Sequence, residues 1–231
     1  MRPEDLYTLH RHRLADSPSG ERQPVLVHAL TGFVDAGQAG ALARDHLLAS
    51  MPHEPVATFD VDALLDYRSR RPTMLFVSDH WESYEQPRLV LHEVIDPAGR
   101  PFLLLEGDEP DVMWERFTDA VIGLVGRFGV RLTLGIHGIP MGVPHTRPTT
   151  LTAHATRPEL VAGRDAWIGT VQVPASIVNL LEYRLGRAGH DAMGFAVHVP
   201  HYVAQSPYPA AAARLLREVA KAGSLRLPLE P

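Results

Sequence analysis

The chain of 231 residues is 45% hydrophobic, carries a formal net charge of −5 and contains no cysteine. These properties predict one compact domain, argue against a basic nucleic-acid-binding face, and exclude disulfides, zinc fingers and thiol catalysis. The apolar runs are too short for a membrane span and the N-terminus lacks the apolar core of a signal peptide, so we expect a cytoplasmic protein. Lys221 is the only lysine, which argues against a Schiff base or a lysine-containing phosphate loop, and no cofactor is expected.

The chain is interpreted as a single α/β domain of residues 1–231 with its core at about 24–222. A lead-in at 1–23 and a loosely attached tail at 224–231 complete it. Apolar runs of strand length occur at 25–30, 55–59, 74–77, 88–95, 102–105, 130–136, 151–155, 167–171 and 192–199. Helical spacing, or helix start and stop signals, predicts helices at 36–50, 111–128, 175–188 and 209–222.

The order of these elements predicts a mixed or mainly parallel sheet with helices on both faces. The turn sequence Asp96-Pro97-Ala98-Gly99 between two apolar runs predicts a hairpin. In open α/β sheets, ligands bind beyond the carboxyl ends of the strands. Five polar, glycine-rich or proline-rich segments follow predicted strands, which favours a single pocket at that edge: TGFVDAG, FDVD, LEGDEP, HGIPMGVPHTRP and VPHYV.

Three of these segments contain acidic residues that are candidates for a functional role. Asp35 is interpreted as a helix cap, and an anion site near the preceding glycine is the alternative. Asp60, together with the other aspartates at 62 and 66, is expected to pair with the arginines at 68–71, and oxygen ligation of magnesium or calcium is the alternative. Glu109 or Asp108 is expected to cap a helix with Pro110 in its first turn, and acid–base work by paired carboxylates is the alternative.

Histidines supply the remaining candidates, His137, His145, His198 and His201. None of them shows the HxxxH or HExxH spacing of a zinc site, and residues three apart on a strand point to opposite faces, so no metal site is expected. A histidine base or a hydrogen-bonding pocket histidine is favoured instead, because histidine titrates near neutrality. No serine occurs in a GxSxG elbow.

Five segments together resemble the proteasome assembly chaperone 2 family, and in particular its prokaryotic branch. In chain order they are GFVDAGQAG, FDVDALLDYRSRRP, LLLEGDEPDVMWERF, GIPMGVPHTRP and VPHYVAQSPYPAAA. The resemblance implies a three-layer α/β/α sandwich, similar to the fold of nucleoside phosphorylases and peptidyl hydrolases, and it implies self-association. It also implies a protein partner, because relatives act as chaperones that hold proteasome α-subunits during assembly.

Two functions therefore remain open. The favoured one is a non-enzymatic, homo-oligomeric protein that binds another protein, proteasomal or other, as an assembly factor. The alternative is a small-ligand-binding protein or enzyme, for a nucleoside-like or phosphate-like compound, with its pocket at the carboxyl edge of the sheet. The candidate pocket residues are Asp35, Asp60, Glu109, His137, His145, Arg147, His201 and Tyr202.

Overall fold

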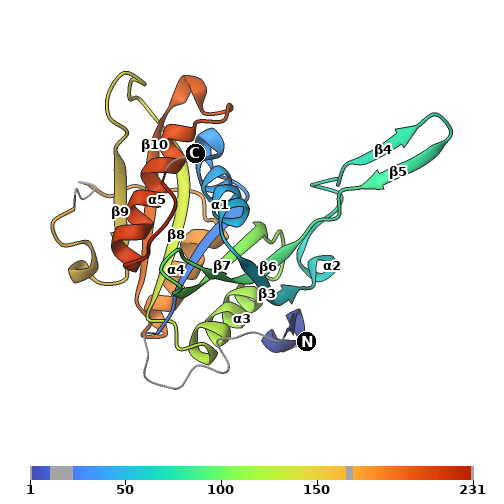
Figure 1. The fold of residues 1–231 in the computed structure, drawn as a ribbon, viewed down its shortest axis with the longest axis horizontal. Helices are drawn as coiled ribbons and strands as arrows, with labels where there is room; N and C mark the ends of the chain where they lie inside the picture. The colour runs from blue at the N-terminus through green and yellow to red at the C-terminus, as the bar shows by residue number, and fades with distance from the viewer. Residues whose placement is uncertain (1, 11–22, 165–168, 230–231) are drawn as a thin grey trace.

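The computed structural model describes residues 2–10, 23–164 and 169–229. Most of the chain forms an α/β domain around an eight-stranded sheet with the order β1-β3-β6-β7-β2-β8-β10-β9 (Figure 1). Two further strands, β4 and β5, pair only with each other. The sheet strands are β1 Tyr7–Leu9, β2 Val25–Thr31, β3 His53–Phe59, β6 Leu89–Ile95, β7 Pro101–Asp108, β8 Leu132–Met141, β9 Leu151–Ala155 and β10 Ala192–Pro200.

The centre of the sheet is parallel. Strand β2 lies between β7 and β8 and is parallel to both, and β10 is parallel to β8. The outer pairs β1–β3, β3–β6, β6–β7 and β9–β10 are antiparallel. The predicted mixed, mainly parallel sheet is confirmed. The carboxyl ends of β7, β2, β8 and β10 therefore meet at one edge, where a site is expected.

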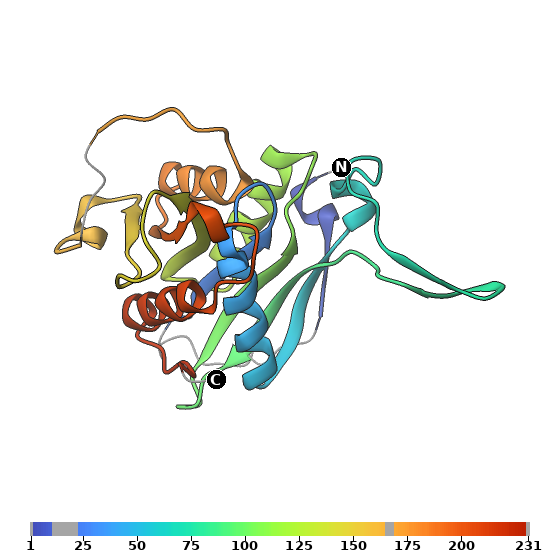
Figure 2. The same cartoon turned by 90° about the horizontal axis from the view of Figure 1, so that it is seen from above.

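Helices cover both faces of this sheet. Helices α1 (Ala39–Ser50) and α5 (Pro209–Gly223) pack on one face, while α3 (Trp114–Arg127) and α4 (Ile177–Arg187) pack on the other (Figure 2). The central strands read as continuous apolar runs because both of their faces are buried. In β2, for example, Val27 faces the α1/α5 core, whereas the next side chain on the opposite face, Leu26, belongs to the α3/α4 core.

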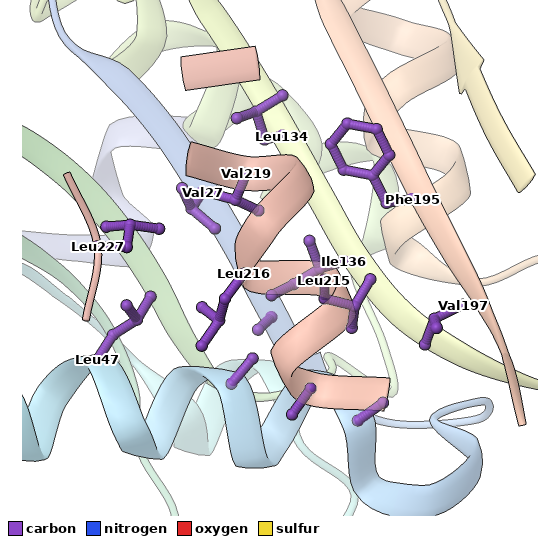
Figure 3. Packing of buried hydrophobic residues seen from close by; sticks show 14 of the residues in the cluster. Val27, Leu47, Leu134, Ile136, Phe195, Val197, Leu215, Leu216, Val219 and Leu227 are labelled. Carbon is purple, nitrogen blue, oxygen red and sulfur yellow. The ribbon is translucent and has the colours of Figure 1, made fainter. Parts of the chain in front are cut away.

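The α1/α5 core shows how the sheet and these helices interlock (Figure 3). Phe195 of β10 and Leu134 of β8 are fully buried against Leu215 and Val219 of α5. Burying a large apolar side chain of this kind contributes roughly 1.5–3 kcal/mol relative to leaving it exposed. Leu227, beyond α5, is buried in the same cluster. The expectation of a loosely attached tail is therefore wrong for residues 224–229.

The two ends of the chain join the domain through specific contacts. The backbone N–H of Arg226 donates to Asp96 Oδ2 at 2.9 Å, so the segment after α5 is held against the β6–β7 turn. At the other end, Tyr7 begins β1, which pairs with β3 at the edge of the sheet. Sequence reasoning assigned no strand to the lead-in, because three residues are too few to show an alternating pattern.

Several predicted helices begin later than expected. The expected helix at 36–50 is interrupted after a short 3₁₀ turn, because Gly37 and Gln38 both adopt left-handed backbone angles, with φ of 68° and 52°. The expected helix at 111–128 begins at Trp114, after Met113 with φ of 60°. Pro110 is therefore not in its first turn, and that prediction is wrong. The helices α4 and α5 lie within two residues of their predicted bounds.

The hairpin predicted around Asp96 is confirmed as β6 and β7. Its turn is fixed by Asp96 Oδ1, which accepts from the backbone N–H of Ala98 and of Arg100. The strand expected at 74–77 is also present, as β4 Met74–Val77, but its partner β5 His80–Tyr84 was not predicted. The strand expected at 167–171 lies partly outside the described residues, and its described part, 169–171, is not a strand.

Strands β4 and β5 form an arm that projects from the domain beside α2 (Val61–Leu64) (Figure 1). Every residue from Thr73 to Gln86 is exposed. The arm nevertheless carries large apolar side chains: Met74, Leu75, Phe76, Val77, Trp81 and Tyr84.

Candidate functional site

A cavity of about 420 Å³ lies at the carboxyl edge of the sheet, on the face that α4 covers. Its volume falls in the range of small-molecule sites, roughly 300–1,000 Å³. The ends of β2 and β8, the segment after β7 and the first turn of α4 all contribute to its wall. Most of the lining is apolar and includes Leu30, Phe33, Ile139, Met141, Val173 and Val178.

Glu109 is the carboxylate of this cavity. It follows β7 and is 6% exposed. Its Oε2 accepts from the backbone N–H of Phe33 at 2.8 Å, and its Oε1 accepts from the backbone N–H of Ile177 at 2.6 Å. One side chain thus joins the segment after β2 to the start of α4. Gly32 makes this possible, because a Cβ at position 32 would lie 1.8 Å from Glu109 Oε2.

The start of α4 compensates the charge of this carboxylate. A helix N-terminus carries a partial positive charge and unpaired N–H groups. Ser176 satisfies one of them by accepting from the backbone N–H of Asn179 at 3.3 Å, and Glu109 satisfies the N–H of Ile177. The prediction that Glu109 caps the helix that follows it is wrong, because its carboxylate caps α4 instead. Asp108, the other proposed cap, is the last residue of β7.

Histidines form a second group along the same face of the sheet. His28 of β2, His137 of β8 and His154 of β9 lie close enough to influence one another electrostatically. Burial, followed by the neighbouring histidines, lowers the pKa of His28 to about 3 and that of His137 to about 4. Both rings are therefore neutral at pH 7. His154 is anchored by a hydrogen bond of 2.9 Å from its Nδ1 to Glu182 Oε1.

His137 has unused hydrogen-bonding capacity. Its Nδ1 is buried and has no hydrogen-bond partner among the described residues, and the same holds for Nδ1 of His28. His137 and His154 both line the cavity, whereas His28 does not. A buried polar atom without a partner is uncommon in folded proteins, and it calls for a water molecule or a ligand. His137 lines the cavity with the part of its ring that stays accessible, so it is a polar group of the wall that a ligand could pair with.

Asp35 lies on the other side of the sheet edge and caps α1. Its Oδ1 accepts from the backbone N–H of Gly40 at 2.9 Å and of Gly138 at 2.8 Å, and its Oδ2 accepts from Ala41 at 3.0 Å. The pairing of β2 with β8 ends at Gly135, so this carboxylate accepts the N–H of Gly138, which β2 no longer pairs. The favoured role of Asp35, a helix cap, agrees with this geometry. Asp35 does not line the cavity.

His145 and Tyr202 meet outside the cavity. The Tyr202 hydroxyl lies 2.9 Å from the backbone N of His145, which donates to it, and 2.8 Å from His145 Nδ1. The contact joins the loop at 143–147 to the turn after β10, where His201 precedes Tyr202 and their rings are 5.4 Å apart. All three side chains are exposed, as is Arg147 in the same loop. These four candidates form a surface cluster, and none of them lines the cavity.

The remaining histidine candidate, His198, is part of the sheet surface. Its two ring nitrogens lie 2.9 Å from the hydroxyls of Thr150 and Thr152. His201 is in the turn that follows β10, so His198 and His201, three residues apart, lie in different surroundings. Among the described residues, no group of three or more histidine, aspartate or glutamate side chains could hold a metal ion.

Asp60 is also remote from the cavity. Its Oδ1 accepts from the backbone N–H of Asp62 and of Ala63 and so caps α2. The expected local ion pairs with the arginines at 68–71 are wrong. Arg70 instead contacts Asp111 at 2.5 Å, and it donates to the backbone carbonyls of Glu109 and Thr31. Because residues far apart in sequence meet here, the local charge pattern could not show the pairing.

Sequence reasoning therefore found two residues of the cavity, Glu109 and His137, and missed others. His154 and Thr152 were not considered, although their spacing of two on a predicted strand places both on one face. Val178 and Phe33 were missed because an apolar residue on a helix or loop carries no sign of facing a cavity.

Comparison with known proteins adds to this geometry. The family model of the PAC2 family matches residues 29–231. A Mycobacterium tuberculosis protein of unknown function has 54% identity and a TM-score of 0.92, with 97% of this chain and 76% of that one covered. A Corynebacterium glutamicum protein of unknown function has 41% identity and a TM-score of 0.89, with 97% and 83% covered.

A third similar structure is that of a proteasome-assembly chaperone homologue. The proteasome-assembly chaperone homologue of Mycobacterium tuberculosis has 28% identity and a TM-score of 0.82, with 89% of this chain and 87% of that chain covered. Comparison with curated proteins gave no match. Within the described residues, no helix combines the length and the apolar character that a membrane crossing requires. The match of the family model over most of the sequence shows that the chain belongs to the PAC2 family.

Proposed function

We propose that this protein is a non-enzymatic, oligomeric protein-binding factor that self-associates through the β4–β5 arm. The exposed apolar surface of the arm carries the proposal. Phe76 and Trp81 face each other across the two strands with ring centroids 5.1 Å apart, yet they are 53% and 62% exposed. A two-stranded hairpin alone is marginally stable in water, so an arm of this composition needs a covering surface.

The arm is apolar on both of its faces. Successive strand residues point to opposite faces, and Leu75 and Phe76 are neighbours in β4 that are both about half exposed. A partner that covered only one face would leave the other in water. Apolar surface of this extent on a projecting element is typical of a protein–protein contact.

Charge favours a second copy of this chain as the partner. The outer half of the arm carries Asp79 and Glu82 around a single histidine, His80, whereas exposed Arg71 and Arg88 outnumber Glu85 at its foot. Two arms placed side by side in opposite directions would bring the acidic tip of each to the basic foot of the other. Such a self-complementary contact is what a two-fold interface requires. The self-association that the family resemblance implies supports the same choice.

Sedimentation velocity tests this proposal. The wild-type protein is expected to be oligomeric at micromolar concentration, and the double variant Phe76→Asp/Trp81→Asp is expected to be monomeric with an unchanged far-UV circular dichroism spectrum. Tyr183→Asp is the matched control, since Tyr183 is 59% exposed on α4, away from the arm. A monomeric wild type, or an arm variant that stays oligomeric, would contradict the proposal.

The assembly role rests on the relation to a proteasome-assembly chaperone homologue. We extend it to this chain as binding of proteasome α-subunits by the oligomer. Mixing the purified protein with α-subunits from the same cell should give a complex on size-exclusion chromatography. Separate elution at tens of micromolar would overturn the assembly role, while the sedimentation result would still decide self-association.

The cavity supports a second function, the binding of a small ligand. Its volume of about 420 Å³, its apolar wall and the part-exposed His137 in that wall favour it. The two functions concern different parts of the molecule and can be tested separately. A ligand should raise the melting temperature in a concentration-dependent way. At a ligand concentration one hundred times its Kd, the free energy of unfolding should rise by about 2.7 kcal/mol.

A further inference from the structure

We propose that the cavity at the carboxyl edge binds an uncharged, mainly apolar small molecule that carries one hydrogen-bonding group facing His137. This inference rests on the proposed ligand-binding function and gives it a chemical class. It replaces the nucleoside-like or phosphate-like compound expected from the sequence, because the charges of the wall do not suit an anion.

The wall offers an anion little positive charge, because the lining histidine His154 is already bound to the carboxylate of Glu182. None of the described residues that line the cavity is an arginine or a lysine. His137 is neutral near pH 7, because burial lowers its pKa to about 4. The carboxylate of Glu109, whose charge α4 offsets, adds no attraction for a phosphate or a carboxylate that entered the cavity. Sites that hold phosphates normally present arginine, lysine or free backbone N–H groups.

A cation is also disfavoured. Both oxygens of Glu109 already accept a backbone N–H, from Phe33 and from Ile177. The positive end of α4 lies at the same carboxylate and offsets its charge. Glu109 and His154 thus each have partners already, and a charged ligand would lose its hydration without gaining an unpaired counter-charge.

The apolar surface of the cavity continues onto its rim. Phe33, Val171 and Val173 line the cavity and are 60–63% exposed. Apolar side chains at a cavity mouth favour entry of an apolar molecule, because their own surface leaves water when it binds. The polar anchor is then His137, whose neutral ring has one donor and one acceptor, so a hydroxyl group can pair with it in either tautomer.

Ligand titration with matched probes tests this class. We expect 1-octanol to bind, followed by calorimetry or thermal shift, and octanoate, octylammonium, adenosine and inorganic phosphate to bind at least tenfold more weakly. Val178→Phe, which adds bulk to the cavity wall, should weaken 1-octanol binding at least tenfold. Val178 lies in the first turn of α4, so circular dichroism should confirm that the variant is folded.

Variants of His137 test the polar anchor. His137→Phe should weaken 1-octanol binding about three- to tenfold, as the loss of one hydrogen bond predicts. His137→Gln keeps a donor and an acceptor and should restore most of the affinity. His201→Phe is the matched control, because His201 is exposed and does not line the cavity.

Each outcome decides one part of the account. Equal or tighter binding of octanoate, octylammonium, adenosine or phosphate would overturn the uncharged, apolar class while leaving a ligand-binding function in place. No binding of any probe would overturn both. Unchanged 1-octanol affinity in His137→Phe would overturn the role of His137.

Discussion

The arm and the cavity both present apolar side chains to solvent, but they do so in opposite shapes. The arm is convex, apolar on both faces and attached to the domain only at its foot. The cavity is concave, lies at the sheet edge and has His137 in its wall. A projecting apolar hairpin can be covered by a protein surface, whereas an apolar cavity with one polar group in its wall fits a small molecule. We therefore propose a different kind of partner for each region.

Histidines sharpen this contrast. On the arm, hydrogen bonds that the carboxylates of Asp79 and then Glu82 accept from the His80 ring raise the pKa of His80. Beside the cavity, burial lowers the pKa of His28 and His137. Histidine is therefore stabilised in its charged form at position 80 on the arm and in its neutral form at positions 28 and 137 in the sheet.

Acid should lower the free energy of unfolding through the buried histidines, and this is the largest effect that we expect. A histidine with a lowered pKa in the folded state takes up a proton on unfolding, so its contribution is present above pH 6.5 and is lost as the pH falls. For His28 and His137 together we expect a loss on the order of 3–5 kcal/mol between pH 7.5 and pH 4.5. Urea unfolding at several pH values measures it.

A variant separates this effect from the titration of other groups. In His28→Phe, the number of protons taken up on unfolding near pH 5 should fall by about one. The slope of unfolding free energy against pH should then fall by about 1.4 kcal/mol per pH unit. An unchanged slope would show that His28 is not buried in its neutral form.

Gly32→Ala should be the next largest effect. The new Cβ would overlap Glu109 Oε2 and force apart the segment after β2 and the start of α4. We expect a loss of about 2–3 kcal/mol in unfolding free energy. Gly142→Ala is the matched control, because nothing lies within 4 Å of a Cβ at Gly142, and it should change stability by less than about 0.5 kcal/mol.

Arg70 joins the two regions, and its replacement should have a smaller effect. It sits at the foot of the arm, pairs with Asp111 and donates to the carbonyl of Glu109 at the cavity. Lysine has no planar fork to serve several acceptors at once. We expect Arg70→Lys to lower the unfolding free energy by about 1 kcal/mol. Arg68→Lys is the control, and an equal loss there would argue against the role of Arg70.

The titration of His80 should give the smallest effect. Its contribution to stability is present below pH 6.5 and is lost as the pH rises through its raised folded pKa. Because the ring is exposed, the change is best followed directly by side-chain NMR. The midpoint of His80 should lie above 6.5, and Asp79→Asn should lower it. A midpoint at or below 6.5 would remove this half of the contrast.

The sheet was predictable because its strands carry their own signals. Continuous apolar runs predicted β2, β8 and β10, which are buried on both faces, and the Asp96 turn predicted the β6–β7 hairpin. The arm was not recognised because His80–Tyr84 mixes polar and aromatic residues and packs on no core. Its stabilising contacts, if they come from another chain, leave no periodic pattern in this one.

The cavity was predictable only in part, for a related reason. Glu109 and His137 follow or end predicted strands, so the edge rule placed them near one another. One partner of the Glu109 carboxylate is Ile177, which is 68 residues away in sequence. Such a contact depends on how α4 docks on the sheet, and local propensity does not contain that information. Residues that looked equally suitable, such as Asp35 and Asp60, are instead caps of neighbouring helices.

Hydrogen exchange of the arm tests the central claim most directly. If a second copy covers the arm, the amides of residues 73–86 should be protected in the wild-type protein, and Phe76→Asp/Trp81→Asp should remove that protection while the central strands stay protected. Rapid exchange of the arm in the wild type at concentrations where it is oligomeric would contradict the account, because the covering surface would then lie elsewhere on the molecule.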